Sequence, residues 1–285
     1  MVLESLIPVR LAEKRPIEMF PLAFLYASLA IFVALWIFPN HASLTTVFFT
    51  VMALLPLMVS LMRFEEESIF VQSKDADTDH KRAMPFFVWM FLGMVVAFSL
   101  WFIVFPQELV SSLFSVQIQT IQSINSNINQ VTANTISAST YFSAVLINNL
   151  KVLLFVLLFS FIYGAGAIFI LTWNASVVSV AIGNSARNVI ARYAATAGLT
   201  GMPAYFAAFS LGILRYMIHG IPEIGAYFVG GLAGGMISVA VLRHEFFDVR
   251  FKQVLYDSSH LVLLAIGLLL LAGVLETFVS PMVPV

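Results

Sequence analysis

The chain has 285 residues, of which 60% are hydrophobic and only 10% are charged, and a single soluble core of that size does not need such a balance. It has no cysteine, which excludes disulfides, thiolate chemistry and cysteine-ligated metals. A formal net charge of -1 argues against bulk attraction to nucleic acid. The hydrophobic composition predicts that the chain lies in a lipid bilayer, and no residue pattern indicates a cofactor.

The first 18 residues form a polar segment with charges of both signs. No small-residue cleavage site follows the apolar run that comes next, so we expect a retained first helix in place of a cleaved signal. We predict that residues 1–18 are a cytoplasmic, amphipathic tail.

Long apolar segments come after the tail, and most are about long enough to cross a hydrocarbon core of ~30 Å as a helix. They predict an all-α, polytopic membrane helix bundle with six to seven transmembrane helices. The predicted spans are 19–38, 42–62, 84–105, 141–173, 222–242 and 261–279, with 202–219 as a shorter candidate. The first three form a region over 19–105, and the rest belong to a transmembrane core over 141–285.

The segment 106–140 has no Lys or Arg, which marks it as external because basic residues collect on the cytoplasmic side. Apolar residues recur in it at steps of three and four, so they form one stripe on an otherwise polar helix. The stripe consists of Phe114, Ile118, Ile121, Ile124, Ile128 and Val131. Three interpretations stay open: contact with a second copy or with another membrane or envelope protein, a lid on the outer membrane surface, and a plain spacer.

The basic residues predict an orientation for the whole chain. All but two of the 14 lie in the tail, in the loop 63–83, in the stretch that holds Arg187 and Arg192, or just before the last span. A seven-span arrangement with a cytoplasmic amino terminus and an external carboxyl terminus places all these segments inside. It requires 202–219 and 222–242 to form an antiparallel pair.

Polar residues occur near the outer end of the predicted fourth span, where Asn148, Asn149 and Lys151 stand close together. Lys151 can extend its ammonium group to the membrane surface, and the group can also be part of a buried polar site. Further along, Gly164 and Gly166 are candidate packing residues. The apolar stretch around Asn174 is too short to cross alone, so we expect it to continue the helix or to re-enter the membrane.

Small residues follow each other at helical spacing in the predicted span 222–242. Two neighbouring stripes result, one of Ala226, Gly230, Gly234 and Ser238 and one of Gly231 and Gly235. Small side chains let helix backbones approach closely, which is the main source of helix association in lipid. We predict that this helix is buried in protein, against other spans of the chain or across a dimer.

The stretch HGIPE at 219–223 places ionisable residues inside a long run of apolar residues. Gly220 is typical of a helix end and Pro222 of a helix start, so we predict a break between two helices here. On that geometry Arg215 and His219 lie at the end of the first helix and Glu223 at the start of the second, where each is favoured by the helix dipole. The three groups can neutralise one another, form a proton, ion or ligand site, or hold a metal.

Three stretches resemble the integral membrane family of the stage II sporulation protein M, most of all its archaeal-type members. They are NNLKVLLF at 148–155, FSFIYGAGAIFILTWNAS at 159–176 and HGIPEIGAYFVGGLAGGMIS at 219–238. The resemblance implies a polytopic membrane protein with no established enzymatic chemistry. In spore-forming bacteria the namesake of the family is a scaffold in a complex with two cell-wall hydrolases, the stage II sporulation proteins D and P.

Two classes of function compete on this reading. The first is a non-enzymatic scaffold or envelope-remodelling component, and the second is a proton- or ion-coupled transporter or channel that uses His219 and Glu223. The sequence has no recognisable catalytic motif. A hydrolase would need a nucleophile or an activated water beside His219.

Overall fold

The computed structural model describes residues 15–71, 80–132, 137–160, 165–196, 202–242 and 249–282, so most of the predicted tail lies outside the described residues. Every regular element in these ranges is a helix, as the apolar, uncharged segments require in a bilayer. In chain order they are η1 (Pro16–Glu18), α2 (Met19–Ile37), η2 (Pro39–His41), α3 (Ala42–Val71), α4 (His80–Val104), α5 (Gln107–Leu113), α6 (Ser115–Thr132), α7 (Ala138–Ser160), α8 (Ala165–Thr196), α9 (Met202–Leu242), α10 (Val249–Val274), η4 (Leu275–Val279) and η5 (Ser280–Met282).

The all-α membrane bundle predicted from composition is confirmed. Within the described residues, six helical stretches are long and apolar enough to cross a membrane. They are Pro16–Ile37, Pro39–Met58, Met84–Val104, Ala138–Phe159, Gly166–Asn188 and Phe251–Val279. Helix α9 adds another long apolar helix, since its residues from 224 to 242 carry no charge.

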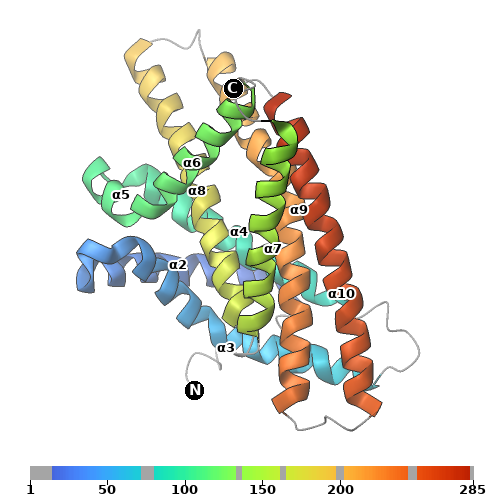
Figure 1. The fold of residues 1–285 in the computed structure, drawn as a ribbon. Coiled ribbons are helices and arrows are strands. Elements are labelled where there is room, and N and C mark those ends of the chain that lie inside the picture. The colour runs from blue at the N-terminus through green and yellow to red at the C-terminus, as the bar shows by residue number, and fades with distance from the viewer. Residues whose placement is uncertain are drawn as a thin grey trace.

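Helices α7, α9 and α10 run side by side along one part of the bundle (Figure 1). Helices α2, α3 and α4 cross them at an angle, and α8 lies between the two groups, in contact with α3, α4, α7 and α9. Helix α8 is therefore the element that joins the amino-terminal helices to the carboxyl-terminal ones.

The prediction of one span over 141–173 is wrong, because two helices occupy this stretch. Helix α7 ends at Ser160 and α8 begins at Ala165. A Cβ atom built at Gly166 would lie 2.7 Å from Cβ of Phe159 and 2.8 Å from the carbonyl oxygen of Val156, so only glycine fits between the two backbones. Gly164 lies outside the described residues, and the short stretch around Asn174 lies inside α8.

The predicted break at HGIPE is also wrong. Helix α9 runs unbroken for 41 residues through Gly220 and Pro222, so 202–219 and 222–242 are one helix and not an antiparallel pair. Proline removes one backbone hydrogen bond, but helices in membranes tolerate that loss when their surroundings compensate for it. A Cβ atom at Gly220 would meet nothing within 4 Å, so no close contact requires a glycine there.

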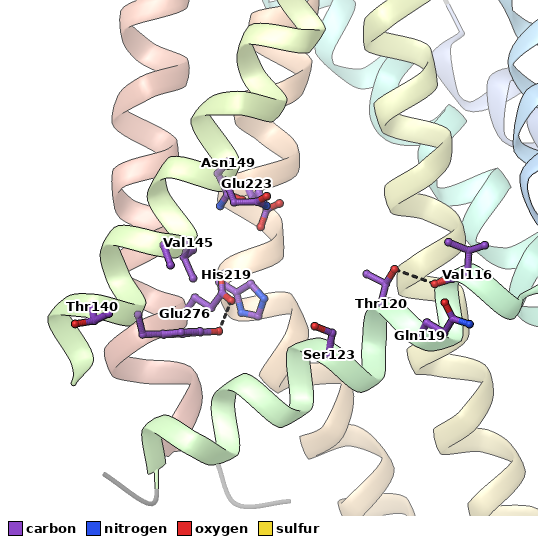
Figure 2. Close-up of a pocket in the computed structure, with 13 residues that line it drawn as sticks. Val116, Gln119, Thr120, Ser123, Thr140, Val145, Asn149, His219, Glu223 and Glu276 are labelled. Carbon is purple, nitrogen blue, oxygen red and sulfur yellow. Dashed lines mark hydrogen bonds between the residues drawn. The ribbon is translucent and has the colours of Figure 1, made fainter. Parts of the chain in front are cut away.

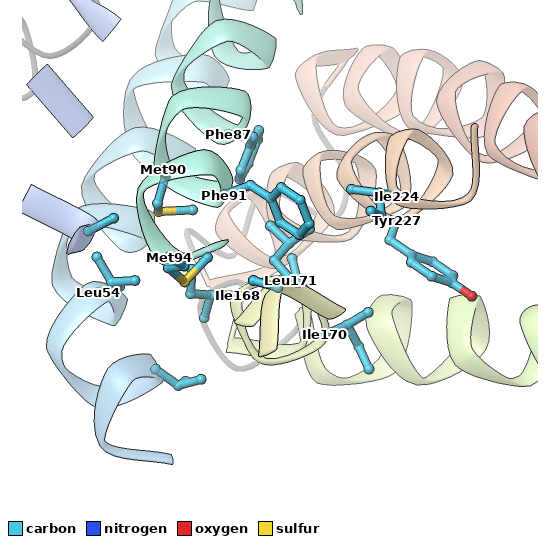
Figure 3. Close-up of a cluster of buried hydrophobic side chains, with 14 of the residues drawn as sticks. Leu54, Phe87, Met90, Phe91, Met94, Ile168, Ile170, Leu171, Ile224 and Tyr227 are labelled. Atoms are coloured by element: carbon cyan, nitrogen blue, oxygen red, sulfur yellow. The ribbon is translucent and has the colours of Figure 1, made fainter. Parts of the chain in front are cut away.

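The hydrophobic core lies where α4, α8 and α9 meet (Figure 3). Phe87 and Phe91 of α4 pack on the ring of Phe228 of α9, with ring centres 5.3 and 6.2 Å apart, and Met94 accepts a hydrogen bond from Thr172 of α8. All five side chains are buried. Large apolar side chains therefore fill the centre of the bundle, and the polar features described below lie at one end of it.

Small residues bring α9 against α7 and α8. A Cβ atom at Gly231 would overlap with Cβ of Ala167, and one at Gly230 would overlap with Leu153. Gly234 and Gly235 are buried as well. The other members of the two stripes, Ala226 and Ser238, are 0% and 1% exposed. The close approach that the small-residue stripes predict takes place within the chain, against α7 and α8.

Arg187 overturns part of the predicted orientation. Its Nη1 atom donates a hydrogen bond to Oε1 of Gln107 at 2.6 Å, and its Nη2 atom donates to the carbonyl oxygen of Phe105. Its guanidinium also lies 5.4 Å from the ring centre of Phe102. Arg187 therefore lies at the same end of the bundle as the segment 106–140, so the two cannot be assigned to opposite sides of the membrane. Its charge is compensated by carbonyl groups at the end of α4 and does not need the cytoplasm.

Helices α5 and α6, which hold most of the segment 106–140, pack on the bundle. Phe114 and Ile121 of the predicted stripe are buried, and Ile118 packs against the core. Gln117 is 1% exposed and joins three helices, because it accepts a hydrogen bond from Ser43 of α3 and donates one to Ser176 of α8. The side chains of Ile124, Ile128 and Val131 lie outside the described residues. The first half of α6 thus has a fixed place over α3 and α8.

Candidate functional site

A polar cavity of about 670 Å³ lies between α6, the first turns of α7, the middle of α9 and the turn η4 (Figure 2). Helix α6 provides one side of it, and α7, α9 and η4 provide the other. The lining residues are Val116, Gln119, Thr120, Ser123, Thr140, Tyr141, Ala144, Val145, Asn148, Asn149, His219, Glu223 and Glu276.

Two carboxylates in this cavity define its electrostatic character. Glu223 comes from α9 and Glu276 from η4, and both line the cavity. Each accepts one hydrogen bond from a tyrosine: Tyr227 donates to Oε1 of Glu223 at 3.1 Å, and Tyr141 donates to Oε1 of Glu276 at 2.8 Å. A tyrosine hydroxyl supplies a donor without a positive charge, so these bonds orient the carboxylates but do not neutralise them.

Glu276 is positioned by an irregular end of the last helix. Helix α10 gives way to the π-helical turn η4, and Glu276 and Thr277 of this turn are buried. Single π-helical turns are rare and are frequently found at functional sites. Here the turn brings Glu276 to the hydroxyl of Tyr141.

His219 forms the third ionisable group of the cavity. Its Nδ1 atom lies 3.0 Å from Oγ of Ser280, and either atom can donate, depending on the tautomer of the ring. Ser280 is fully buried and does not line the cavity. A histidine and a serine are therefore paired here, but the serine is not presented to a molecule in the cavity as a nucleophile would be.

Asn149 contributes an amide group without a hydrogen-bond partner to the cavity. Its side chain is 4% exposed, it lines the cavity, and its amide nitrogen has no hydrogen-bond partner. Figure 2 shows Asn149 beside Glu223, and His219 beside Glu276. A buried amide donor without a partner costs roughly 1–3 kcal/mol, so an acceptor at this position would stabilise the site.

The structure brings together four of the predicted site residues and leaves two of them, Lys151 and Asn174, apart. His219, Glu223, Asn148 and Asn149 all line the cavity. The other three predicted site residues are Lys151, Asn174 and Arg215. Lys151 is exposed, and Asn174 donates a hydrogen bond to the carbonyl oxygen of Ile170 within α8.

The predicted neutralisation of Glu223 by Arg215 depended on two separate helices. In one unbroken helix, residues 215 and 223 are about 12 Å apart along the axis, at 1.5 Å per residue, and do not stand at the meeting ends of two helices. The side chain of Arg215 lies outside the described residues. The observed partners are different: His219 contacts Ser280 of η5, and Glu223 accepts a hydrogen bond from Tyr227 of α9.

Sequence reasoning missed Glu276, Tyr141, Tyr227 and Ser280 as site residues. One signal was present: Glu276 is the only charged residue between 261 and 285. A lone carboxylate in an apolar span is costly and indicates a functional site or a polar partner. The tyrosines gave no signal of this kind, since a tyrosine in a span is compatible with ordinary packing or with the membrane surface.

The comparisons with known proteins agree with this architecture. The family model of the stage II sporulation protein M matches residues 83–281, which extend from α4 to η5 and include every cavity residue. That family is not a known family of enzymes. Neither the curated proteins nor the solved structures give a match. Because the match covers well over half of the chain, the protein belongs to the stage II sporulation protein M family of integral membrane proteins.

Proposed function

We propose that the protein is a cation-coupled transporter, in which a proton or another cation binds between Glu223 and Glu276 and crosses the membrane. The observation that carries the proposal is that two carboxylates from distant parts of the chain line one polar cavity. Carboxylates are costly inside a membrane, and those that occur there usually belong to an ion path or a binding site.

The electrostatics of the cavity favour a positively charged occupant. Among its lining residues, His219 is the only one that can become positive, and it is already in contact with Ser280. A nearby positive charge or a bound proton stabilises a carboxylate, and like charges that share one site disfavour each other. The charge of the cavity therefore supports uptake of a positive species and opposes an anion.

The proposed orientation has a cytoplasmic amino terminus and an external carboxyl terminus. Seven crossings, the six apolar stretches together with α9, put the two termini on opposite sides. The lack of basic residues in 106–140 supports an external position for α5 and α6. On this orientation the cavity lies toward the outer side, and Arg187 is an external arginine compensated by the end of α4.

Flux in reconstituted liposomes tests the proposal. Wild-type protein should move protons or a monovalent cation down an imposed gradient, and Glu223→Gln or Glu276→Gln should abolish this flux. Glu108→Gln is a matched control, because Glu108 is an exposed carboxylate on α5 that does not line the cavity. No flux in the wild type, or equal flux in all four proteins, would contradict the transporter assignment.

Family membership supports a second candidate, a non-enzymatic scaffold that organises membrane or envelope partners. A scaffold of this kind needs an accessible contact surface, and α6 is the element whose amphipathic stripe suggested one. Gln122 on α6 is exposed, and the cysteine-free chain allows a single thiol to be introduced there as Gln122→Cys. Oxidative cross-linking into a dimer in membranes would support a homo-oligomeric scaffold, whereas a monomer under the same conditions would oppose it.

A further inference from the structure

We infer that the cavity is built for a primary ammonium group with an adjacent oxygen acceptor, such as an amino alcohol, and not for a bare metal ion. The inference rests on the proposed cation site and gives the chemical class of its occupant. Three independent features of the cavity lead to it: its size, the second oxygen atom of each carboxylate, and the amide nitrogen of Asn149, which has no hydrogen-bond partner.

The size of the cavity suits a small organic molecule. Its volume of about 670 Å³ falls within the range of roughly 300–1,000 Å³ that is usual for pockets binding organic ligands. Apolar lining residues, Val116, Ala144 and Val145, offer contacts to a carbon skeleton next to the polar groups.

The arrangement of acidic groups also favours an ammonium over a metal. Within the described residues, no cluster of three or more His, Asp or Glu side chains is placed to hold a metal ion. Both carboxylates use Oε1 to accept from a tyrosine, which leaves a second oxygen on each. A primary ammonium has three N–H donors that such oxygens can accept, whereas a quaternary ammonium has none.

Asn149 favours a ligand that carries a hydrogen-bond acceptor next to its ammonium group. Its amide nitrogen is a buried donor without a partner, and it stands beside Glu223 (Figure 2). A ligand that puts nitrogen against Glu223 and Glu276 and an oxygen against Asn149 would satisfy all three residues. Two sources present this chemistry: a free amino alcohol and the headgroup of phosphatidylethanolamine, in which phosphate oxygens take the place of the hydroxyl.

Binding by the full chain in phosphatidylcholine nanodiscs tests the inference for the free ligand. Ethanolamine should bind saturably and choline should not, although both carry one positive charge, because only ethanolamine has N–H donors. We expect Glu276→Gln and Asn149→Ala each to weaken ethanolamine binding by about tenfold or more. The control Glu108→Gln should bind as the wild type does, and thermal unfolding of each variant would show that it is folded.

A second arm tests the lipid source. Nanodiscs with phosphatidylethanolamine should raise the unfolding temperature of the wild type relative to phosphatidylcholine nanodiscs, and Glu276→Gln should lose this shift. A positive result in either arm supports the ammonium site and identifies its source. Equal binding of ethanolamine and choline, or no response in both arms, would overturn it.

The same measurements separate this inference from the proposed transport. Proton or metal-ion flux that depends on Glu223, without any amine response, would leave the transporter in place and refute the ammonium site. Ethanolamine binding that depends on Glu276, without flux of any cation, would refute transport and support the ammonium site.

Discussion

Glu223, in the middle of α9, and Glu276, in the turn after α10, line one cavity although they come from distant parts of the chain, and among the lining residues only His219 can carry a positive charge. Each is oriented by a tyrosine, Glu223 by Tyr227 and Glu276 by Tyr141. In the proposed cation site this pair would hold the positive occupant, so the contacts that fix the two side chains matter for function.

The hydroxyl of Tyr227 should contribute to stability through its bond to Glu223. Tyr227 is 1% exposed, so Tyr227→Phe removes a buried donor to an acidic side chain. We expect the free energy of unfolding to fall by about 1.5–3 kcal/mol. Denaturation in mixed micelles measures the change, with Tyr256→Phe as the control because Tyr256 is 67% exposed. An equal, small effect of both substitutions would show that the bond to Glu223 contributes little.

Gly231 should tolerate no side chain. In Gly231→Leu the new atoms would overlap with Ala167 on α8, so α9 would have to move away from its neighbour. We expect a loss of stability of about 1–3 kcal/mol from overpacking. Unfolding in mixed micelles again provides the measurement, and a stability equal to that of the wild type would contradict the close contact of α8 and α9.

Gly220 should behave in the opposite way. An alanine there meets nothing within 4 Å, and α9 is helical on both sides of it. Replacing glycine by alanine inside a helix stabilises it by roughly 1 kcal/mol, so Gly220→Ala should raise the unfolding temperature. If the helix ended at Gly220 in the left-handed conformation, the same substitution would lower it. The sign of the change therefore distinguishes one continuous helix from two.

Arg187 should hold the α4–α5 corner to α8. Arg187→Ala removes the bonds to Gln107 and to the carbonyl of Phe105, together with the contact to the ring of Phe102. Hydrogen bonds from charged groups contribute about 1.5–3 kcal/mol, and we expect a loss of this size. Lys151→Ala is the control, because Lys151 is an exposed basic residue. A similar result for the two would show that Arg187 carries no structural role.

The sequence was sufficient for the class of fold and for half of the site. Hydrophobic length predicts membrane helices well, because each helix must satisfy its own backbone in lipid. The sequence pattern identified His219, Glu223 and Asn149, because they are polar residues within long apolar segments. Glu276 gave the same signal, but nothing in the sequence says that the end of α10 packs against α7, and only that contact puts it in the cavity.

The wrong predictions share a physical origin, since each used a local rule that tertiary packing overrides. Glycine and proline at 220 and 222 are typical of helix ends, yet a helix within a bundle continues through them. The long apolar run over 141–173 looked continuous, but Gly166 allows α8 to fold back on α7. The positive charge of Arg187 suggested the cytoplasm, whereas carbonyl groups at the end of α4 compensate it.

The most direct test of the account is a double-mutant cycle on cation flux in proteoliposomes with Glu223→Gln, Glu276→Gln and the double variant. If the two carboxylates form one binding site, each single substitution should abolish flux as completely as the double one. Independent, additive losses from the two substitutions, or full flux in the double variant, would contradict the shared site.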